Sequence, residues 1–260
     1  MNKLFVIILF FLSQITTAQN NIIVEYKDYR TYTKSIINVN SATLYITSDN
    51  AYYKSEVFEK INTGSSIEVN GLAVKNENSE TIDEIIIDRK KKTLTQKISA
   101  DLFLTSKYAV VENLPKMIWK LTSDKKNIGK FECKKATTTF RGREYEAWYT
   151  EQIPVSLGPW KFNGLPGLIL EAKDKSETFK WELKSVKNAT FSIDSQININ
   201  KRYEILSFEN FDKKRVNKIN DKINIIRTRN ASRDFKVGFM YTTDEEREPI
   251  NEFRNQTTFR

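Results

Sequence analysis

Four glutamates near the middle of the chain are the residues best suited to acid–base chemistry: Glu144, Glu146, Glu151 and Glu171. Glycoside hydrolysis uses two carboxyl groups, about 5 Å apart or about 6.5–9.5 Å apart depending on the stereochemical course. Alternating glutamates on a hairpin are also typical of a solvated strand face, and no sequence feature pairs these four. A two-carboxylate, glycan-acting enzyme is therefore the less favoured alternative, and no catalytic residue is assigned.

The sequence contains no histidine, and Cys133 is its single cysteine. Ser-His-Asp catalysis, Cys-His catalysis and histidine zinc sites are excluded on composition, as are clusters of thiolate ligands. We therefore predict no metal site and no cofactor. Because Phe131 and Cys133 share one face of a strand-like run, we expect Cys133 to be a small buried apolar residue rather than a reactive thiol.

The first residues have the pattern of a secretory signal peptide. Lys3 precedes an unbroken apolar run from Leu4 to Leu12, and small polar residues lead to Ala18. Nine apolar residues are too few to span a bilayer, which takes about 20. We expect residues 1–18 to be a cleaved signal peptide, and no later segment is a candidate transmembrane helix. The sequence thus predicts export to the periplasm or to the cell surface.

The formal net charge is +9. A basic protein favours anionic partners such as acidic glycans, phosphate-bearing lipids or nucleic acid. The lysines and arginines are spread widely, however, which favours a solvated surface. Export removes the usual nucleic-acid partner and no recognition fold is apparent, so nucleic acid is not an expected ligand.

Residues 19–188 alternate between apolar and polar positions in short runs. In "TLYIT" (43–47) and "TFKWEL" (178–183), every second residue is apolar, which is typical of half-buried strands. Three charged or glycine-containing turns separate such runs, at 88–92, 141–143 and 174–177. Successive hairpins predict an antiparallel meander rather than parallel strands with helical crossovers.

The periodicity changes near Leu206, and a helix is expected over about 207–229. Ser207 is a suitable N-cap. The apolar residues at roughly helical spacing are Phe208, Phe211, Val216, Ile219, Ile223 and Ile226. We expect this amphipathic helix to pack on the sheet, with a membrane-surface helix as the alternative because its other face is basic. One β domain over 19–236 and a strand or tail over 237–260 complete the predicted organisation.

The stretch "FNGLPGLIL" (162–170) concentrates glycine and proline in a chain with only 8 Gly and 5 Pro. Asn163-Gly164 accepts a positive φ, and Pro166-Gly167 fits the centre of a type II turn, in which the glycine has a positive φ. We expect Leu165, between the two reversals, to insert into the core. A phosphate-binding loop is disfavoured because Pro166 removes a backbone donor and an apolar strand follows.

The hexapeptide "GLPGLI" and the segments around it resemble the GLPGLI family, a family of exported proteins of Gram-negative envelopes. The matching residues are Leu114, Pro115, Trp119, Lys120, Cys133 to Ala136, Gly142, Arg143, Ala147 to Thr150, Ile153, Pro154, Gly158, Pro159, Phe162, and the hexapeptide itself, Gly164, Leu165, Pro166, Gly167, Leu168 and Ile169. Such chains are also similar, more distantly, to the non-catalytic, bowl-shaped N-terminal domain of some bacterial peptide:N-glycanases. The resemblance implies a mainly β fold, an open and strongly curved antiparallel sheet (a bowl or half-barrel). It implies no activity.

These features favour an exported, non-catalytic protein that acts as a binding or scaffold module. The expected partner is an envelope protein such as an outer-membrane receptor, or a lipid or glycan. Clusters of aromatic residues and arginine commonly anchor interfaces, and the candidates are Arg143, Trp148, Tyr149, Trp160 and Phe162. The alternative for these rings is the core. A carrier of an apolar or acylated ligand in the concave face of the sheet is the other functional alternative.

Overall fold

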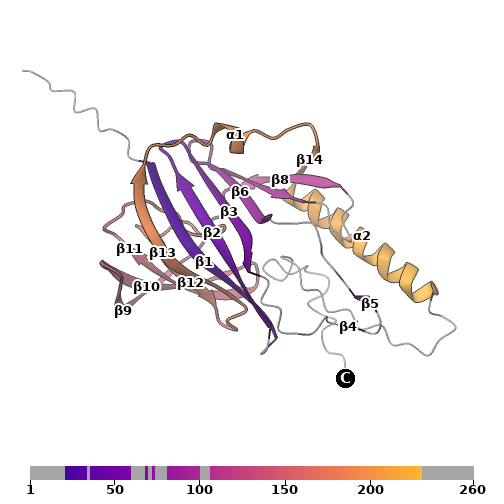
Figure 1. Cartoon of the computed structure of the whole chain (residues 1–260), viewed down its shortest axis with the longest axis horizontal. Helices are drawn as coiled ribbons and strands as arrows, with labels where there is room; N and C mark the ends of the chain where they lie inside the picture. Colours follow the sequence, from indigo (N-terminus) through magenta and orange to yellow (C-terminus); the bar gives the residue numbers. More distant parts are fainter. Residues whose placement is uncertain are drawn as a thin grey trace, which may run out of the picture.

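The structure, a computed structural model, describes residues 21–33, 36–59, 68–69, 72–73, 81–99 and 106–229. These residues are mainly β, as predicted (Figure 1). The strands of the main sheet are β1 (Asn21–Thr33), β2 (Ile36–Ile46), β3 (Asn50–Glu59), β6 (Thr81–Asp88), β7 (Thr93–Ile98), β8 (Lys107–Asn113), β9 (Lys120–Ile128), β10 (Phe131–Phe140), β11 (Arg143–Thr150), β12 (Leu168–Asp174), β13 (Phe179–Ala189) and β14 (Tyr203–Ser207). A separate pair is formed by β4 (Glu68–Val69) and β5 (Leu72–Ala73), and the helices are α1 (Asp194–Ile197) and α2 (Phe208–Arg229).

The main sheet is open and has 12 strands in the order β14-β8-β7-β6-β3-β2-β1-β13-β12-β11-β10-β9. All three hairpins expected from the sequence are present, with turns between β6 and β7, β10 and β11, and β12 and β13. Two pairings depart from the expected antiparallel meander, in which consecutive strands pair. The first strand pairs with β13, far along the chain, and β14 lies parallel to β8, the one parallel pairing in the part described.

Chain connectivity requires the sheet to curl. β8 and β9 are ten positions apart in the sheet order, which in a flat sheet would separate them by about 48 Å. Residues 114–119 alone connect these two strands, and an extended chain of that length spans at most about 25 Å. The two ends of the sheet must therefore face each other, and the predicted curvature is confirmed.

Side chains on the inner face make contacts that a flat sheet could not allow. The indole Nε1 of Trp181 on β13 donates to the hydroxyl of Tyr53 on β3 at 3.1 Å, although β1 and β2 lie between these strands. Across the opening, Glu112 of β8 forms ion pairs with Arg141, in the β10–β11 turn, and with the buried Lys161 at 3.1 Å. These contacts fasten the two ends of the curved sheet to each other.

The predicted helix is confirmed as α2, which packs on β8 and β14 near one edge of the sheet (Figure 1). Ser207 is its N-cap: the Oγ atom accepts a hydrogen bond from the backbone N–H of Asn210 at 3.3 Å. The buried ring of Phe211 packs against Tyr108 and Val110 of β8. The expected signal peptide and C-terminal tail lie outside the described residues.

Candidate functional site

The hexapeptide loop is part of the core. Leu165 has 1% of its surface exposed and belongs to the main apolar cluster, as its position between two reversals predicts. Gly164 has a φ of +95°, which agrees with the expected reversal at Asn163-Gly164. Its N–H donates to the Ser156 hydroxyl at 3.0 Å, and the N–H of Ile169 donates to the Leu157 carbonyl at 2.9 Å. The loop is thus tied to the preceding segment by its own backbone.

The second glycine is needed for a different reason from the one predicted. Gly167 does not have a positive φ, so the expected type II turn at Pro166-Gly167 is wrong. A Cβ atom at Gly167 would lie 2.7 Å from the carbonyl carbon of Thr150 and closer still to its oxygen. The backbone of the loop passes directly over the end of β11, and only a residue without a side chain fits there.

Asn163 connects this loop to the segment between β8 and β9. Its Nδ2 atom donates to the carbonyls of Pro115 and Lys161, each at 3.0 Å. Its own carbonyl accepts a hydrogen bond from the indole of Trp119 at 2.8 Å. The hexapeptide therefore braces the short connection that brings the two ends of the sheet together.

An aromatic cluster beside the loop fills the inner face. Trp160 stacks on Trp181 with 6.0 Å between ring centroids, and Phe162 meets Trp181 edge-on at 5.3 Å. Tyr145 contacts Phe162 at 5.0 Å. Aromatic pairs in these geometries stabilise a core by about 0.5–1.5 kcal/mol each beyond the area that they bury. This cluster is the packing that the curved sheet closes around.

The five residues proposed as partner-binding anchors do not form one surface. Tyr149, Trp160 and Phe162 are buried, so a correction is needed: these three rings follow the core alternative. Trp148 points to the opposite face of β11 and is half-buried, with the Lys126 ammonium 4.5 Å from its ring centroid. Arg143 lies at the rim of the inner face. The sequence left both alternatives open for these rings, because they lie close to turn residues.

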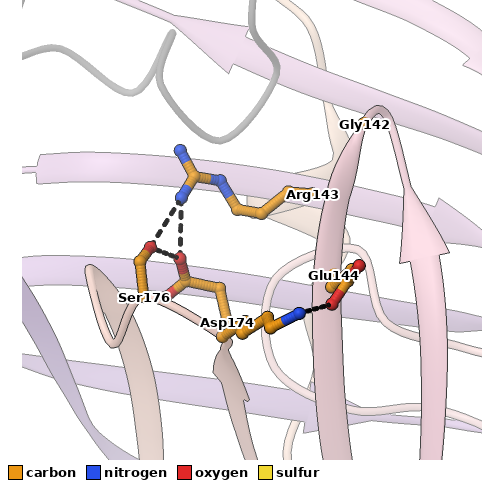
Figure 2. A pocket seen from close by; sticks show the side chains of 6 residues that line it. Gly142, Arg143, Glu144, Asp174 and Ser176 are labelled. Carbon is orange, nitrogen blue, oxygen red and sulfur yellow. Dashed lines mark hydrogen bonds and ion pairs between the residues drawn. The ribbon is translucent and has the colours of Figure 1, made fainter.

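Arg143 lines a shallow hollow of about 590 Å³ between two hairpin turns (Figure 2). The fully buried Asp174 lies at the centre of this hollow. Its Oδ2 atom accepts hydrogen bonds from Arg143 at 2.7 Å and from the Ser176 hydroxyl. Its Oδ1 atom accepts a hydrogen bond from the backbone N–H of Phe179 at 2.8 Å. Both carboxylate oxygens are thus engaged in fixing the β12–β13 turn. The arrangement stabilises a hairpin and offers no free base.

Each of the four glutamates near the hexapeptide forms an ion pair with lysine, and none is buried. The pairs are Glu144 with Lys175 (2.8 Å), Glu146 with Lys135 (3.1 Å), Glu151 with Lys134 (2.8 Å) and Glu171 with Lys126. This is the ion-pair pattern of a solvated strand face, which the sequence already favoured for these residues.

Cys133 is fully buried, and burial raises the pKa of its thiol to about 11. The prediction of a buried, apolar cysteine is confirmed. Across residues 21–229, leaving aside the gaps in the description, no three His, Cys, Asp or Glu side chains gather as metal ligands. Over the same residues, no helix combines the length and apolar character needed to cross a membrane.

A buried polar cluster on the inner face was not anticipated. Its members are Asp28, Arg30, Asn40, Ser55 and Asp83. Arg30 Nη2 lies 2.9 Å from Asp83 Oδ2, although β2 and β3 separate the two strands. The sequence does contain an indication, because Asp28 and Arg30 continue the inward-facing alternation of Val24 and Tyr26.

Part of the chain matches a known protein family. The sequence model of a family described as "Protein of unknown function (Porph_ging)" matches residues 139–171. This segment covers the β10–β11 turn, β11, the hexapeptide loop and three rings of the aromatic cluster, those of Tyr145, Trp160 and Phe162. No curated protein matches the sequence.

Three solved structures match parts of this chain. A structure of PNGF-II is 19% identical to this chain with a TM-score of 0.51, and the match covers 75% of this chain and 32% of PNGF-II. A second crystal form of PNGF-II is 20% identical with a TM-score of 0.49, and the match covers 72% of this chain and 31% of that protein. An uncharacterized conserved protein from Thermus thermophilus is 10% identical with a TM-score of 0.40, covering 73% of this chain and 91% of that protein. The chain spans about a third of the length of PNGF-II, and at such identity the likeness concerns the fold alone. The chain is thus similar, over residues 139–171, to a family of unknown function, and its fold resembles that of a part of PNGF-II.

Proposed function

We propose that the chain is an exported, non-catalytic protein of the cell envelope, of the GLPGLI type, that binds another envelope component. Its hexapeptide serves the fold: Leu165 is a core residue, and Gly167 allows close passage over Thr150. The most conspicuous motif of the sequence is thereby explained by packing. The functional part of the molecule then lies on the surface that this packing holds in place.

The observation that carries the proposal is a fixed apolar projection at the edge of the sheet. Ile118 has 84% of its surface exposed, while its neighbour Met117 is buried and its neighbour Trp119 is hydrogen-bonded to Asn163. Leu121, at the start of the edge strand β9, is 57% exposed. The backbone that carries Ile118 is braced on both sides, so little backbone entropy is lost on binding, which suits an interface anchor.

Charge around this projection indicates the chemistry of the partner. Lys116 and Lys120 flank Ile118, are exposed, and form no ion pair with any described residue. Complementary charge steers association and selects partners. We therefore propose an acidic surface on another envelope protein as the partner.

The filled inner face does not favour the carrier alternative. The buried side chains of Trp160, Phe162 and Leu165 fill part of that face, which supports binding at the edge over carriage of an acyl chain. The two-carboxylate alternative is likewise not supported by the four glutamates near the hexapeptide, because each of them forms an ion pair with a lysine. Binding at the edge is the function that the arrangement of described residues supports best.

Site-specific photocrosslinking in the native envelope tests this proposal. A photoreactive amino acid replaces Ile118 in one variant and the exposed Ser195 of α1, which Figure 1 shows well apart from β9, in a matched control. We expect one discrete crosslinked protein, rich in surface carboxylates, from position 118 and none from position 195. Equal, diffuse products from both positions would contradict an interface at Ile118, and lipid bound stoichiometrically to the purified protein would favour the carrier instead.

A further inference from the structure

The buried polar cluster on the inner face lies on four neighbouring strands, β1, β2, β3 and β6. Its five members are each at most 4% exposed. Burying polar groups among apolar residues is unfavourable unless their hydrogen bonds are made. The hydrogen bonds within this cluster therefore show which of its polar atoms still require a partner.

In one half of the cluster, Asp28 Oδ2, Ser55 and Arg30 form hydrogen bonds or ion pairs with other members. Asp28 Oδ2 accepts a hydrogen bond from the Ser55 hydroxyl at 2.6 Å and lies 3.4 Å from Arg30 Nη2. Ser55 reaches Asp28 across the intervening strand β2, where the inward-facing residue is the small Ala42. Arg30 also bonds to Asp83. Asp28 Oδ2 is thus held in a fixed position.

The other half of the cluster is not satisfied by the residues that the structure describes. Asp28 Oδ1 and both amide atoms of Asn40 have no hydrogen-bond partner among the described residues, although each atom is inaccessible to solvent. The two residues are directly opposite each other in the β1–β2 register and face the same side. Each unmade hydrogen bond of a buried group costs about 1–3 kcal/mol. One donor group and two acceptor atoms are therefore left without a partner among the described residues, on the same face of two adjacent strands.

We propose that Asp28 and Asn40 bind a pair of neighbouring hydroxyl groups inside the sheet. Between Asn40 Nδ2 and Asp28 Oδ1, the ligand atom must accept one hydrogen bond and donate another, which an O–H group does. Asn40 Oδ1 points away from Nδ2 and needs a second donor, so two oxygen atoms are required. Two water molecules or the adjacent hydroxyls of a 1,2-diol supply the same chemistry.

The enclosure of the site is consistent with long-lived occupancy. Buried waters in proteins typically make about three hydrogen bonds to polar groups that would otherwise be unsatisfied. Asp28 Oδ1 and the Asn40 amide provide such partners, and Asp28 is itself fixed by Ser55. The proposed site is independent of the surface at Ile118.

Two crystal structures of the wild-type protein, at a resolution that shows ordered water, test the site. One crystal is grown without any polyol and the other is soaked in ethylene glycol, a 1,2-diol. Two oxygen peaks within hydrogen-bond distance of Asp28 Oδ1 and Asn40 support the proposal with water as the source. Their replacement by one diol on soaking supports it with diol as a further ligand. A direct Asp28–Asn40 hydrogen bond, or no oxygen in either crystal, overturns it.

Variants in solution provide a second test. Asn40→Leu removes both amide atoms at nearly constant volume, whereas Ser55→Ala, the matched control, removes a hydrogen bond but leaves the three unsatisfied atoms in place. Magnetic relaxation dispersion of water oxygen counts long-lived internal waters. We expect Asn40→Leu to lose two of them and Ser55→Ala to keep them. If Asn40→Leu does not fold, wild-type protein without any long-lived internal water overturns the proposal on its own.

Discussion

The two glycines of the hexapeptide can be distinguished by single alanine substitutions. In Gly167→Ala, the new methyl group would lie 2.7 Å from the Thr150 carbonyl carbon. The two backbone segments would have to separate by roughly 1 Å to reach ordinary van der Waals contact. Overpacking of this kind costs about 1–3 kcal/mol. Because the clash is with backbone atoms, which cannot rotate away, we expect the upper end, about 3 kcal/mol.

The expected loss corresponds to a fall in Tm of roughly 6–12 °C for a domain of this size. Thermal and urea unfolding followed by circular dichroism would measure it. Gly164→Ala is the first control: it has space for a methyl group but a φ of +95°, so we expect a loss of about 1–2 kcal/mol from backbone strain. Gly129→Ala, at +56° with no atom within 4 Å, is the second control, and should cost about 1 kcal/mol. If Gly167→Ala were no more destabilising than Gly129→Ala, the close passage over Thr150 would be refuted.

Three further substitutions or measurements test other parts of the structure. Glu112→Gln removes the carboxylate between Arg141 and the buried Lys161, and should cost about 3 kcal/mol in urea unfolding; wild-type stability would show that this contact does not fasten the sheet ends. Cys133 should be unreactive toward a thiol reagent at pH 8 until the protein unfolds. Because its folded pKa of about 11 exceeds the ordinary value of 9.0, its contribution to stability should be complete below about pH 9 and lost as pH rises through about 11, and rapid native-state labelling would contradict this. Ser207→Ala should lower the free energy of unfolding by about 1 kcal/mol, and no change in Tm would show that the Asn210 N–H does not depend on this cap.

Local features of the sequence predicted local features of the fold. The turn at Arg141-Gly142 and the charged turn after Asp88 separate runs of alternating polarity, so their hairpins follow from neighbouring residues. The apolar spacing after Ser207 likewise predicted a helix that begins at Phe208. Such elements are determined within a dozen residues, which is the range over which pattern and propensity act.

Other features depend on contacts between distant residues. Nothing near Asn21 indicates that β1 pairs with β13, and nothing near Gly167 reveals that Thr150 lies against it. The position of Trp160 and Phe162 among turn residues kept an exposed site open as an alternative to the core, but the curved sheet closes over that loop. The contacts of each of these residues are determined by the tertiary fold, which the local sequence pattern does not predict.

The pairing of β1 with β13 has a consequence for how the chain acquires its shape. Strand β1 (residues 21–33) lies at the centre of the sheet. One of its two neighbours, β13 (residues 179–189), is synthesised about 150 residues later. Closing so long a loop is entropically unfavourable, and topologies dominated by such pairings fold slowly. If the chain is exported, as we propose, late closure of the sheet would keep the polypeptide unfolded during translocation, so that β1 and β13 would pair only after both had crossed the membrane.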